Sequence, residues 1–96
     1  MATITATEDF TQWLRKLRDA KARAIIVERV QRVARGLLGD VQPVGGQVSE
    51  LRIHYGPGYR VYFTRRGEEV VVLLCGGDKT SQAKDIKHAQ ALVAGL

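Results

Sequence analysis

The feature that most constrains the fold is the run VVVLLC at residues 70–75, which is apolar at every position. A strand with one solvated face alternates apolar and polar side chains, whereas a strand covered on both faces is apolar throughout. The run therefore predicts a strand that is buried on both faces.

Two segments before this run alternate with a period of two, as strands with one apolar face do. In residues 50–55 the two faces are Leu51, Ile53 and Tyr55, and Glu50, Arg52 and His54. In residues 60–64 they are Val61 and Phe63, and Arg60, Tyr62 and Thr64. Turn sequences at residues 56–58 and 66–68 separate the strands, so we expect antiparallel neighbours whose polar face is open.

Three other segments have the spacing of amphipathic helices. The first follows Thr7 as N-cap and buries Phe10, Trp13, Leu14 and Leu17. The second spans residues 20–38, between Asp19 as N-cap and Gly39 as the terminating glycine, and buries Ile26, Val30, Val33 and Leu37. The third follows Thr80 or Ser81 and buries Ile86, Ala89 and Val93. The first two form a helical hairpin, which must cover one face of the sheet.

The expected fold is α+β in the order β-α-α-β-β-β-α, with an antiparallel sheet packed on the N-terminal helical hairpin and a C-terminal helix. Residues 2–6 form an edge strand, and residues 40–47 are a connecting loop that contains Pro43 and two glycines. Residues 1–96 are few enough to form one domain.

Several classes of protein do not fit this chain. The single cysteine, Cys75, cannot form an internal disulfide, and no apolar stretch approaches the ~20 residues of a membrane span. One cysteine and two distant histidines lack zinc-site spacing, and residues 76–80 lack the spacing of a phosphate-binding P-loop. We therefore expect a cytoplasmic protein without a metal or cofactor.

The chain is basic, with a formal net charge of +5 and a pI of about 9.8, which favours an anionic partner. The positive excess is spread over both halves of the sequence, so any cationic patch has to be assembled by folding.

Four segments together resemble the RelE/ParE superfamily of type II toxins, and within it the phage Gp49-like or HigB-like addiction-module killer proteins. They are residues 49–53, 56–62 and 73–79, and a closing group of Gln82, Asp85 and Ile86. The resemblance covers nearly the whole chain.

This resemblance implies a toxin that a co-encoded antitoxin with a helix-turn-helix domain neutralises in a hetero-oligomer. Most members of the superfamily cleave mRNA in the ribosomal A site, so the expected activity is that of a ribosome-dependent endoribonuclease that inhibits translation. A minority, the ParE-like toxins, poison DNA gyrase and cleave nothing, which leaves a second interpretation open. A basic RNA-binding domain without toxicity is a third.

The resemblance also implies a set of catalytic residues: Arg52, His54, Arg60 and Lys79. Metal-independent cleavage needs attack by the ribose 2′-OH, stabilisation of the phosphorane and protonation of the 5′-oxygen. The two arginines are suited to phosphate oxygens, and the histidine titrates near neutrality. The family's catalytic aromatic near the C-terminus has no counterpart, because Lys84 and Asp85 occupy that region. RNA or ribosome contacts are expected from Tyr55, Tyr62, Arg65, Arg66 and Lys84.

Several of these residues also have a structural interpretation. Arg52 can pair with Glu50 or Glu68, and a single histidine on a strand is usually structural or solvated. Charges at a hairpin tip, such as Arg65 and Arg66, are ordinarily solvated. The arginines of the second helix form either a solvated face or a surface that docks on ribosomal RNA.

Overall fold

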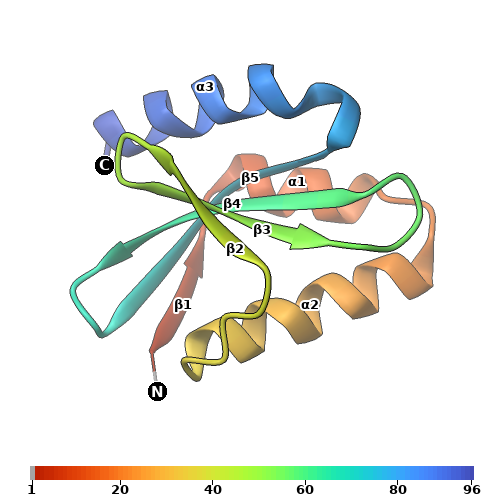
Figure 1. Cartoon of the computed structure of the whole chain (residues 1–96), viewed down its shortest axis with the longest axis horizontal. Helices are drawn as coiled ribbons and strands as arrows, with labels where there is room; N and C mark the ends of the chain where they lie inside the picture. The colour runs from red at the N-terminus through yellow and green to blue at the C-terminus, as the bar shows by residue number, and fades with distance from the viewer. Residues whose placement is uncertain (1) are drawn as a thin grey trace.

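The computed structural model describes residues 2–96, in which five strands form one twisted sheet in the order β1-β5-β4-β3-β2 (Figure 1). The strands are β1 (Thr3–Ala6), β2 (Val41–Gly45), β3 (Val48–Ile53), β4 (Tyr59–Arg66) and β5 (Val70–Asp78). The helices are α1 (Glu8–Lys16), α2 (Ala20–Ala34) and α3 (Gln82–Ala94). β1 is parallel to β5, and the other neighbouring strands are antiparallel. The α+β class is confirmed.

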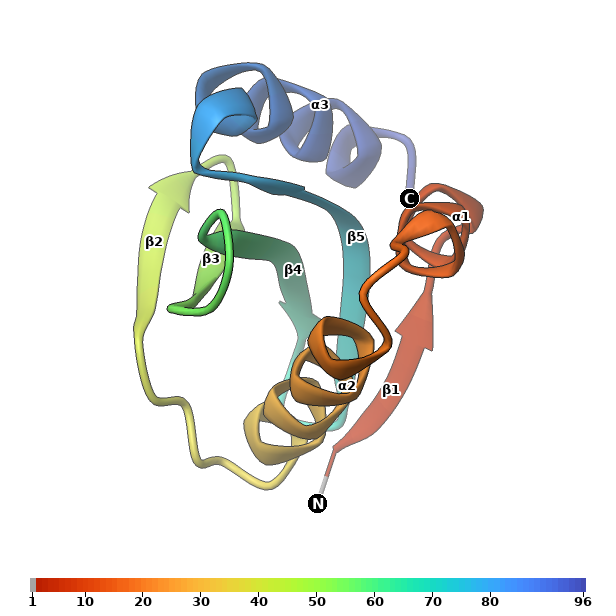
Figure 2. The same cartoon turned by 90° about the vertical axis from the view of Figure 1, so that its right-hand side faces the viewer.

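The sheet separates two hydrophobic cores. Figure 2 shows α2 on the concave side of the sheet and α3 outside it. The core beside α1 and α2 contains Phe10, Ile26, Val33, Leu51, Val61, Phe63, Val71 and Leu73. The core beneath α3 contains Val48, Tyr62, Val72, Leu74, Cys75 and Ala89. β5 supplies buried side chains to both cores, as the unbroken apolar run predicted.

Both expected N-caps of the helical hairpin are confirmed. The Thr7 side chain accepts a hydrogen bond from the Phe10 amide, and Asp19 accepts from the amides of Lys21 and Ala22. The end of the second helix was predicted wrongly, because α2 stops four residues earlier than expected. Gly36 has a φ of 86°, and the amide of Leu37 donates to the Arg32 carbonyl at 2.9 Å, which closes the helix before Gly39 is reached.

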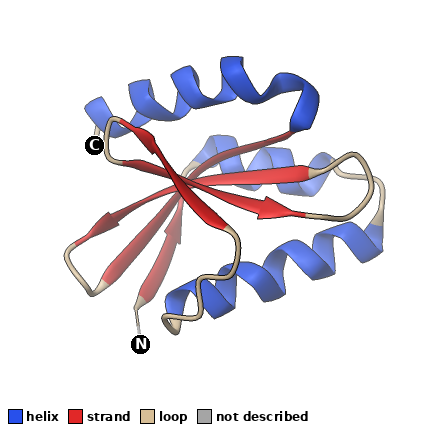
Figure 3. Ribbon diagram, viewed as in Figure 1, coloured by secondary structure: helices blue, strands red, loops and turns tan. Residues whose placement is uncertain are grey.

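Residues 40–47 are not simply a loop, because Val41–Gly45 forms the edge strand β2 (Figure 3). The observed order is therefore β-α-α-β-β-β-β-α. β2 pairs with β3 only, so Pro43 sits where a proline is tolerated in a sheet. Proline and glycine have low strand propensity, so the sequence of this segment did not predict a strand.

The start of α3 also differs from expectation. Asp78 caps a short 3₁₀ turn (Lys79–Ser81) by accepting a hydrogen bond from the Thr80 amide at 2.8 Å, and no side chain caps α3 itself. Two glycines at the end of β5 allow the side chains of Trp13 and Asp85 to pack directly against the strand. A Cβ on Gly76 would overlap the Trp13 ring, and one on Gly77 would overlap the Asp85 carboxylate.

The expectation that the polar face of β3 and β4 is open is wrong for most of its length. α3 covers this face, and Glu50, Arg60, Tyr62 and Thr64 are all buried beneath or beside it. The cause is that Val48, Val72 and Leu74 form an apolar surface on the same face, against which α3 packs.

No helix within residues 2–96 is long and apolar enough to cross a membrane.

Candidate functional site

The uncovered end of this face is an open hollow of about 680 Å³. It lies between the ends of β3 and β4, the turn that joins them, and the 3₁₀ turn before α3. The lining residues are Arg52, His54, Tyr55, Gly56, Pro57, Gly58, Arg60, Lys79 and Gln82. The structure thus brings together all four residues that the resemblance marked as catalytic: Arg52, His54, Arg60 and Lys79. We call this site the β3–β4 hollow.

Two arginines form the floor of the β3–β4 hollow. Arg52 on β3 is the register partner of Arg60 on β4, so the two side chains share one face of the sheet. Arg60 is only 7% exposed, and its Nε has no hydrogen-bond partner among residues 2–96. A buried, unpaired guanidinium beside a like charge is costly. An anion in the hollow, such as a phosphate, would offset that cost by pairing with both cations.

A fully buried carboxylate, Glu50, lies beside the arginines. Its Oε1 accepts a hydrogen bond from Arg52 Nε at 2.9 Å, so the pairing considered from the sequence is present. The hydrogen bond and charge of Glu50 raise the pKa of Arg52 above its already high ordinary value. Arg52 is therefore a fixed positive charge at the edge of the hollow.

His54 lies one residue beyond β3, and its Nε2 is 2.6 Å from Oδ2 of Asp40. The hydrogen bond with His54 is the main cause that lowers the pKa of Asp40, and the charges of Arg52 and Arg60 add to it. Asp40 is therefore ionised at neutral pH and can orient the imidazole and stabilise its protonated form. No described residue hydrogen-bonds to Nδ1 of His54.

Asp40 is a site residue that the sequence reasoning missed. It stands in the segment between α2 and β2, fourteen positions before His54, and no local pattern links the two residues. A non-local backbone contact holds it there, since the Arg52 amide donates to the Asp40 carbonyl at 2.9 Å. The sequence around Asp40 is uncharged from Gly36 to Val44 apart from this residue, and the strand that follows it was itself overlooked.

Tyr55 lines the β3–β4 hollow but also has a structural role. Its hydroxyl donates to Oδ2 of Asp19 at 2.9 Å, and Lys21 Nζ lies 5.7 Å from the centre of its ring. The hydrogen bond to Asp19 raises the pKa of Tyr55. Tyr55 thereby ties the β3–β4 turn to the N-terminus of α2, and its contact with RNA stays a prediction.

The other residues expected to contact RNA lie outside the β3–β4 hollow. The prediction for Tyr62 was wrong, because α3 covers its ring completely and burial raises the pKa of its phenol. Arg65 and Arg66 lie at the far end of β4, roughly 17 and 20 Å along the strand from Arg60 at ~3.4 Å per residue. Lys84 is exposed on α3 but does not line the hollow.

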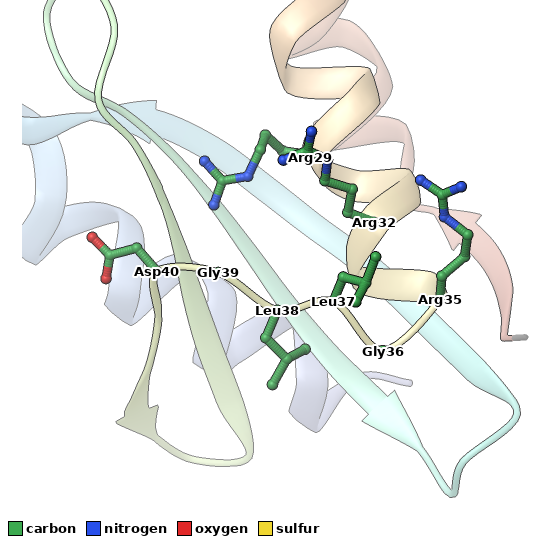
Figure 4. A pocket seen from close by; sticks show the side chains of 8 residues that line it. All are labelled: Arg29, Arg32, Arg35, Gly36, Leu37, Leu38, Gly39 and Asp40. Carbon is green, nitrogen blue, oxygen red and sulfur yellow. The ribbon is translucent and has the colours of Figure 1, made fainter.

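A second open hollow, of about 850 Å³, lies at the C-terminal end of α2 (Figure 4). Its lining consists of Arg29, Arg32, Arg35, Gly36, Leu37, Leu38, Gly39 and Asp40. We call it the arginine hollow. Arg32 pairs with Glu28 at 2.9 Å, whereas no ion pair among residues 2–96 involves Arg29 or Arg35. Asp40 lines this hollow and contacts His54, so the two hollows adjoin.

Glycine shapes the arginine hollow. In Figure 4 the Arg29 side chain extends from α2 toward the segment that carries Gly39 and Asp40. A Cβ on Gly39 would lie 2.8 Å from Nη2 of Arg29, so a larger residue would displace the guanidinium.

Within residues 2–96, no three His, Cys, Asp or Glu side chains are grouped so that they could hold a metal ion.

Comparisons with known proteins support one family. Residues 12–93 match the model of a family described as phage-derived protein Gp49-like. An uncharacterised protein of Haemophilus influenzae is 45% identical over 93 residues, which cover 97% of this chain and 94% of that protein. The resemblance to Gp49-like proteins is thereby confirmed.

Solved structures show the same fold. A chain in the crystal structure of the intact E. coli RelBE toxin–antitoxin complex is similar with a TM-score of 0.68 and 16% identity, over 81% of this chain and 96% of that chain. The conserved hypothetical protein HP0894 from Helicobacter pylori has a TM-score of 0.52 and 15% identity, over 83% of this chain and 97% of its own.

Proposed function

Because the chain belongs to the family of phage-derived Gp49-like proteins, and its fold resembles a chain of the RelBE complex, we propose that it is the toxin of a toxin–antitoxin pair. We further propose that it is an endoribonuclease that cleaves mRNA on the ribosome and thereby inhibits translation in the cytoplasm. One observation carries the nuclease proposal. The buried Arg60, whose Nε has no hydrogen-bond partner among residues 2–96, lies beside Arg52 in a hollow lined also by His54, which pairs with Asp40.

The proposed reaction places the scissile phosphate over the two arginines. The ribose 2′-oxygen attacks phosphorus while His54 takes its proton, and Asp40 stabilises the resulting imidazolium. Arg52 and Arg60 bind the non-bridging oxygens, whose negative charge grows in the phosphorane. The P–O5′ bond then breaks, water protonates the leaving 5′-oxygen, and Lys79 offsets its charge. The products are a 2′,3′-cyclic phosphate and a free 5′-hydroxyl.

The arginine hollow extends the proposed RNA contact. Its cations adjoin the β3–β4 hollow through Asp40, and Arg29 and Arg35 have no anionic partner in the described chain. A nucleic-acid backbone presents phosphates at regular intervals, so one chain can reach both hollows. We assign the arginine hollow to phosphates that flank the cleaved one, either in the mRNA or in the surrounding ribosomal RNA.

A cognate antitoxin is the proposed protein partner. Support comes from the similarity to a chain of a toxin–antitoxin complex. We expect an antitoxin with a helix-turn-helix domain, encoded beside the toxin and bound to it in a hetero-oligomer. Co-purification of this chain with the product of the neighbouring reading frame tests this expectation.

Expression of the toxin without antitoxin, followed by primer extension on a translated mRNA, tests the activity. Wild-type protein is expected to stop growth and to produce cuts within codons, and His54→Ala is expected to produce neither. Lys87→Ala, an exposed change on α3, serves as the control and should behave as wild type. Intact mRNA accompanied by double-strand DNA breaks would instead favour a gyrase poison, and unaffected growth would favour an RNA-binding domain without toxicity.

A further inference from the structure

Glu50 is completely buried and accepts hydrogen bonds from three side chains on three elements of the fold. Its Oε1 accepts from Arg52 Nε at 2.9 Å. Its Oε2 accepts from the Tyr62 hydroxyl at 3.1 Å and from Gln82 Nε2 at 2.8 Å. A buried carboxylate is expensive unless its oxygens are satisfied, and here both are. The arrangement is therefore a formed polar network in an otherwise apolar layer.

The contact with Glu50 fixes the direction in which Arg52 points. A guanidinium is planar and offers its five donors in a rigid fork. Because Nε is bound to Glu50, the plane of the group is set and the Nη1 and Nη2 donors remain available. The Arg52 side chain is still 36% exposed, so a ligand in the β3–β4 hollow can reach it.

The same carboxylate also fixes a wall of the hollow. Gln82 is the first residue of α3 and lines the hollow, and its amide is held by Glu50. Arg60, on the neighbouring strand, is diagonal to Glu50 in the ladder, so the buried negative charge lies close to both arginines. Without it, the two cations would lose the buried anion nearest to them, and Asp40 at the rim would be left as the anion that acts on both.

We propose that Glu50 is a positioning residue that orders Arg52 and Gln82 in the β3–β4 hollow, so that the Nη donors of Arg52 meet a phosphate of the RNA. This role rests on the proposed function, since it concerns the binding of RNA in the same hollow. Glu50 touches no substrate itself and acts through Arg52.

A double-mutant cycle tests this role. The affinity for a short, fluorescently labelled 2′-O-methyl oligoribonucleotide, which cannot be cleaved, is measured by anisotropy for wild type, Glu50→Gln, Arg52→Gln and the double variant. Glu50→Gln is expected to weaken binding about fivefold or more in the wild-type background and less than about twofold in the Arg52→Gln background. Equal losses in both backgrounds would overturn the proposal, because Glu50 would then act only on the fold.

Tyr62→Phe is the matched control. It removes one hydrogen bond to the same carboxylate and leaves the contact with Arg52 intact. We expect lower thermal stability with an RNA affinity within about twofold of wild type, as for a change that affects only the polar network. If Tyr62→Phe weakened RNA binding as much as Glu50→Gln does, loosening of the network would explain both results and the positioning role would be lost.

A measurement without RNA separates this inference from the proposed function. The Nε–H resonance of Arg52 in an NMR spectrum reports its hydrogen bond to Glu50. The resonance should exchange slowly with water in wild type and rapidly in Glu50→Gln. If wild type cleaves no mRNA on purified ribosomes, the proposed function fails, and the NMR result alone decides whether Glu50 orders Arg52. An unchanged resonance in Glu50→Gln would refute the ordering itself.

Discussion

Arg52 and Arg60 face each other across β3 and β4, and Nε of the more buried Arg60 has no hydrogen-bond partner within residues 2–96. A folded protein ordinarily pairs such a group, because an unpaired buried charge costs free energy. Like charges directly opposite each other in a ladder add to that cost. This relationship is the basis of our proposal that the two arginines bind an anion, which would offset their cost to stability.

Replacement of Arg60 by methionine should separate stability from function. Methionine fills similar space without a buried charge, so we expect a melting temperature equal to or above that of wild type. RNA cleavage should fall roughly 100-fold or more, the size of effect seen when a group that stabilises transition-state charge is removed. Thermal melts and a cleavage assay check both outcomes. A clear loss of thermal stability would show instead that Arg60 supports the fold.

The His54–Asp40 pair predicts a specific dependence of stability on pH. The folded state lowers the pKa of Asp40, so the ionised carboxylate stabilises the protein above its unfolded pKa of about 3.9. This contribution is lost as pH falls through the lower, folded pKa. The melting temperature of wild type should therefore exceed that of Asp40→Asn above about pH 5, and the margin should shrink below about pH 4 as Asp40 is protonated.

The matched control for this pair is the same change in a His54→Ala background. Because the hydrogen bond with His54 is the largest cause of the pKa shift, most of the margin should vanish there. A margin of unchanged size would mean that Asp40 acts through the arginines and not through the imidazole.

The arginine hollow predicts a change in the salt dependence of RNA binding. Each lost phosphate contact should reduce the slope of log K against log salt by roughly 0.7 for a single strand. We expect this reduction for Arg29→Gln and for Arg35→Gln, measured by anisotropy from low to moderate salt. Arg15→Gln, an exposed change on α1, is the control and should leave the slope unaltered. Slopes equal to that of wild type for all three variants would exclude the arginine hollow from the contact with single-stranded RNA.

Strand β5, which is paired on both sides by β1 and β4, predicts a strong contrast between two register partners. Val72 on β5 is buried, and its partner on β1, Thr5, is exposed. Val72→Asp should abolish folding, because it buries an unpaired charge in the middle of the sheet. Thr5→Asp should change the melting temperature by only a few degrees. Circular dichroism of both variants provides the measurement, and a folded, fully active Val72→Asp protein would be incompatible with the strand placement.

Much of the framework could be predicted because its signals are local. The apolar run at residues 70–75, the alternation around Leu51 and Val61, and the caps at Thr7 and Asp19 each depend on neighbours in sequence. The prediction that Arg52, His54, Arg60 and Lys79 form one site came from the family resemblance. In the structure, the pairing of β3 with β4 places the two arginines side by side.

What could not be predicted depends on distant partners. The sequence pattern suggested that Glu50 and Tyr62 are solvated, because the helix that covers them is α3, whose Gln82 donates to Glu50 from 32 positions away along the chain. Alternation shows that a face is polar, but it does not show whether a helix covers that face. Asp40 escaped notice for a related reason, since its partner is brought close only by the pairing of β2 with β3.

The most direct test of the account is cleavage of a defined mRNA on purified ribosomes. The account predicts that wild-type protein produces fragments ending in a 2′,3′-cyclic phosphate, and that His54→Ala and Arg60→Met reduce the rate roughly 100-fold or more while remaining folded. Absence of cleavage by the wild type would contradict the proposal that the β3–β4 hollow is a ribonuclease site. Cleavage by both variants at the wild-type rate would contradict it as well.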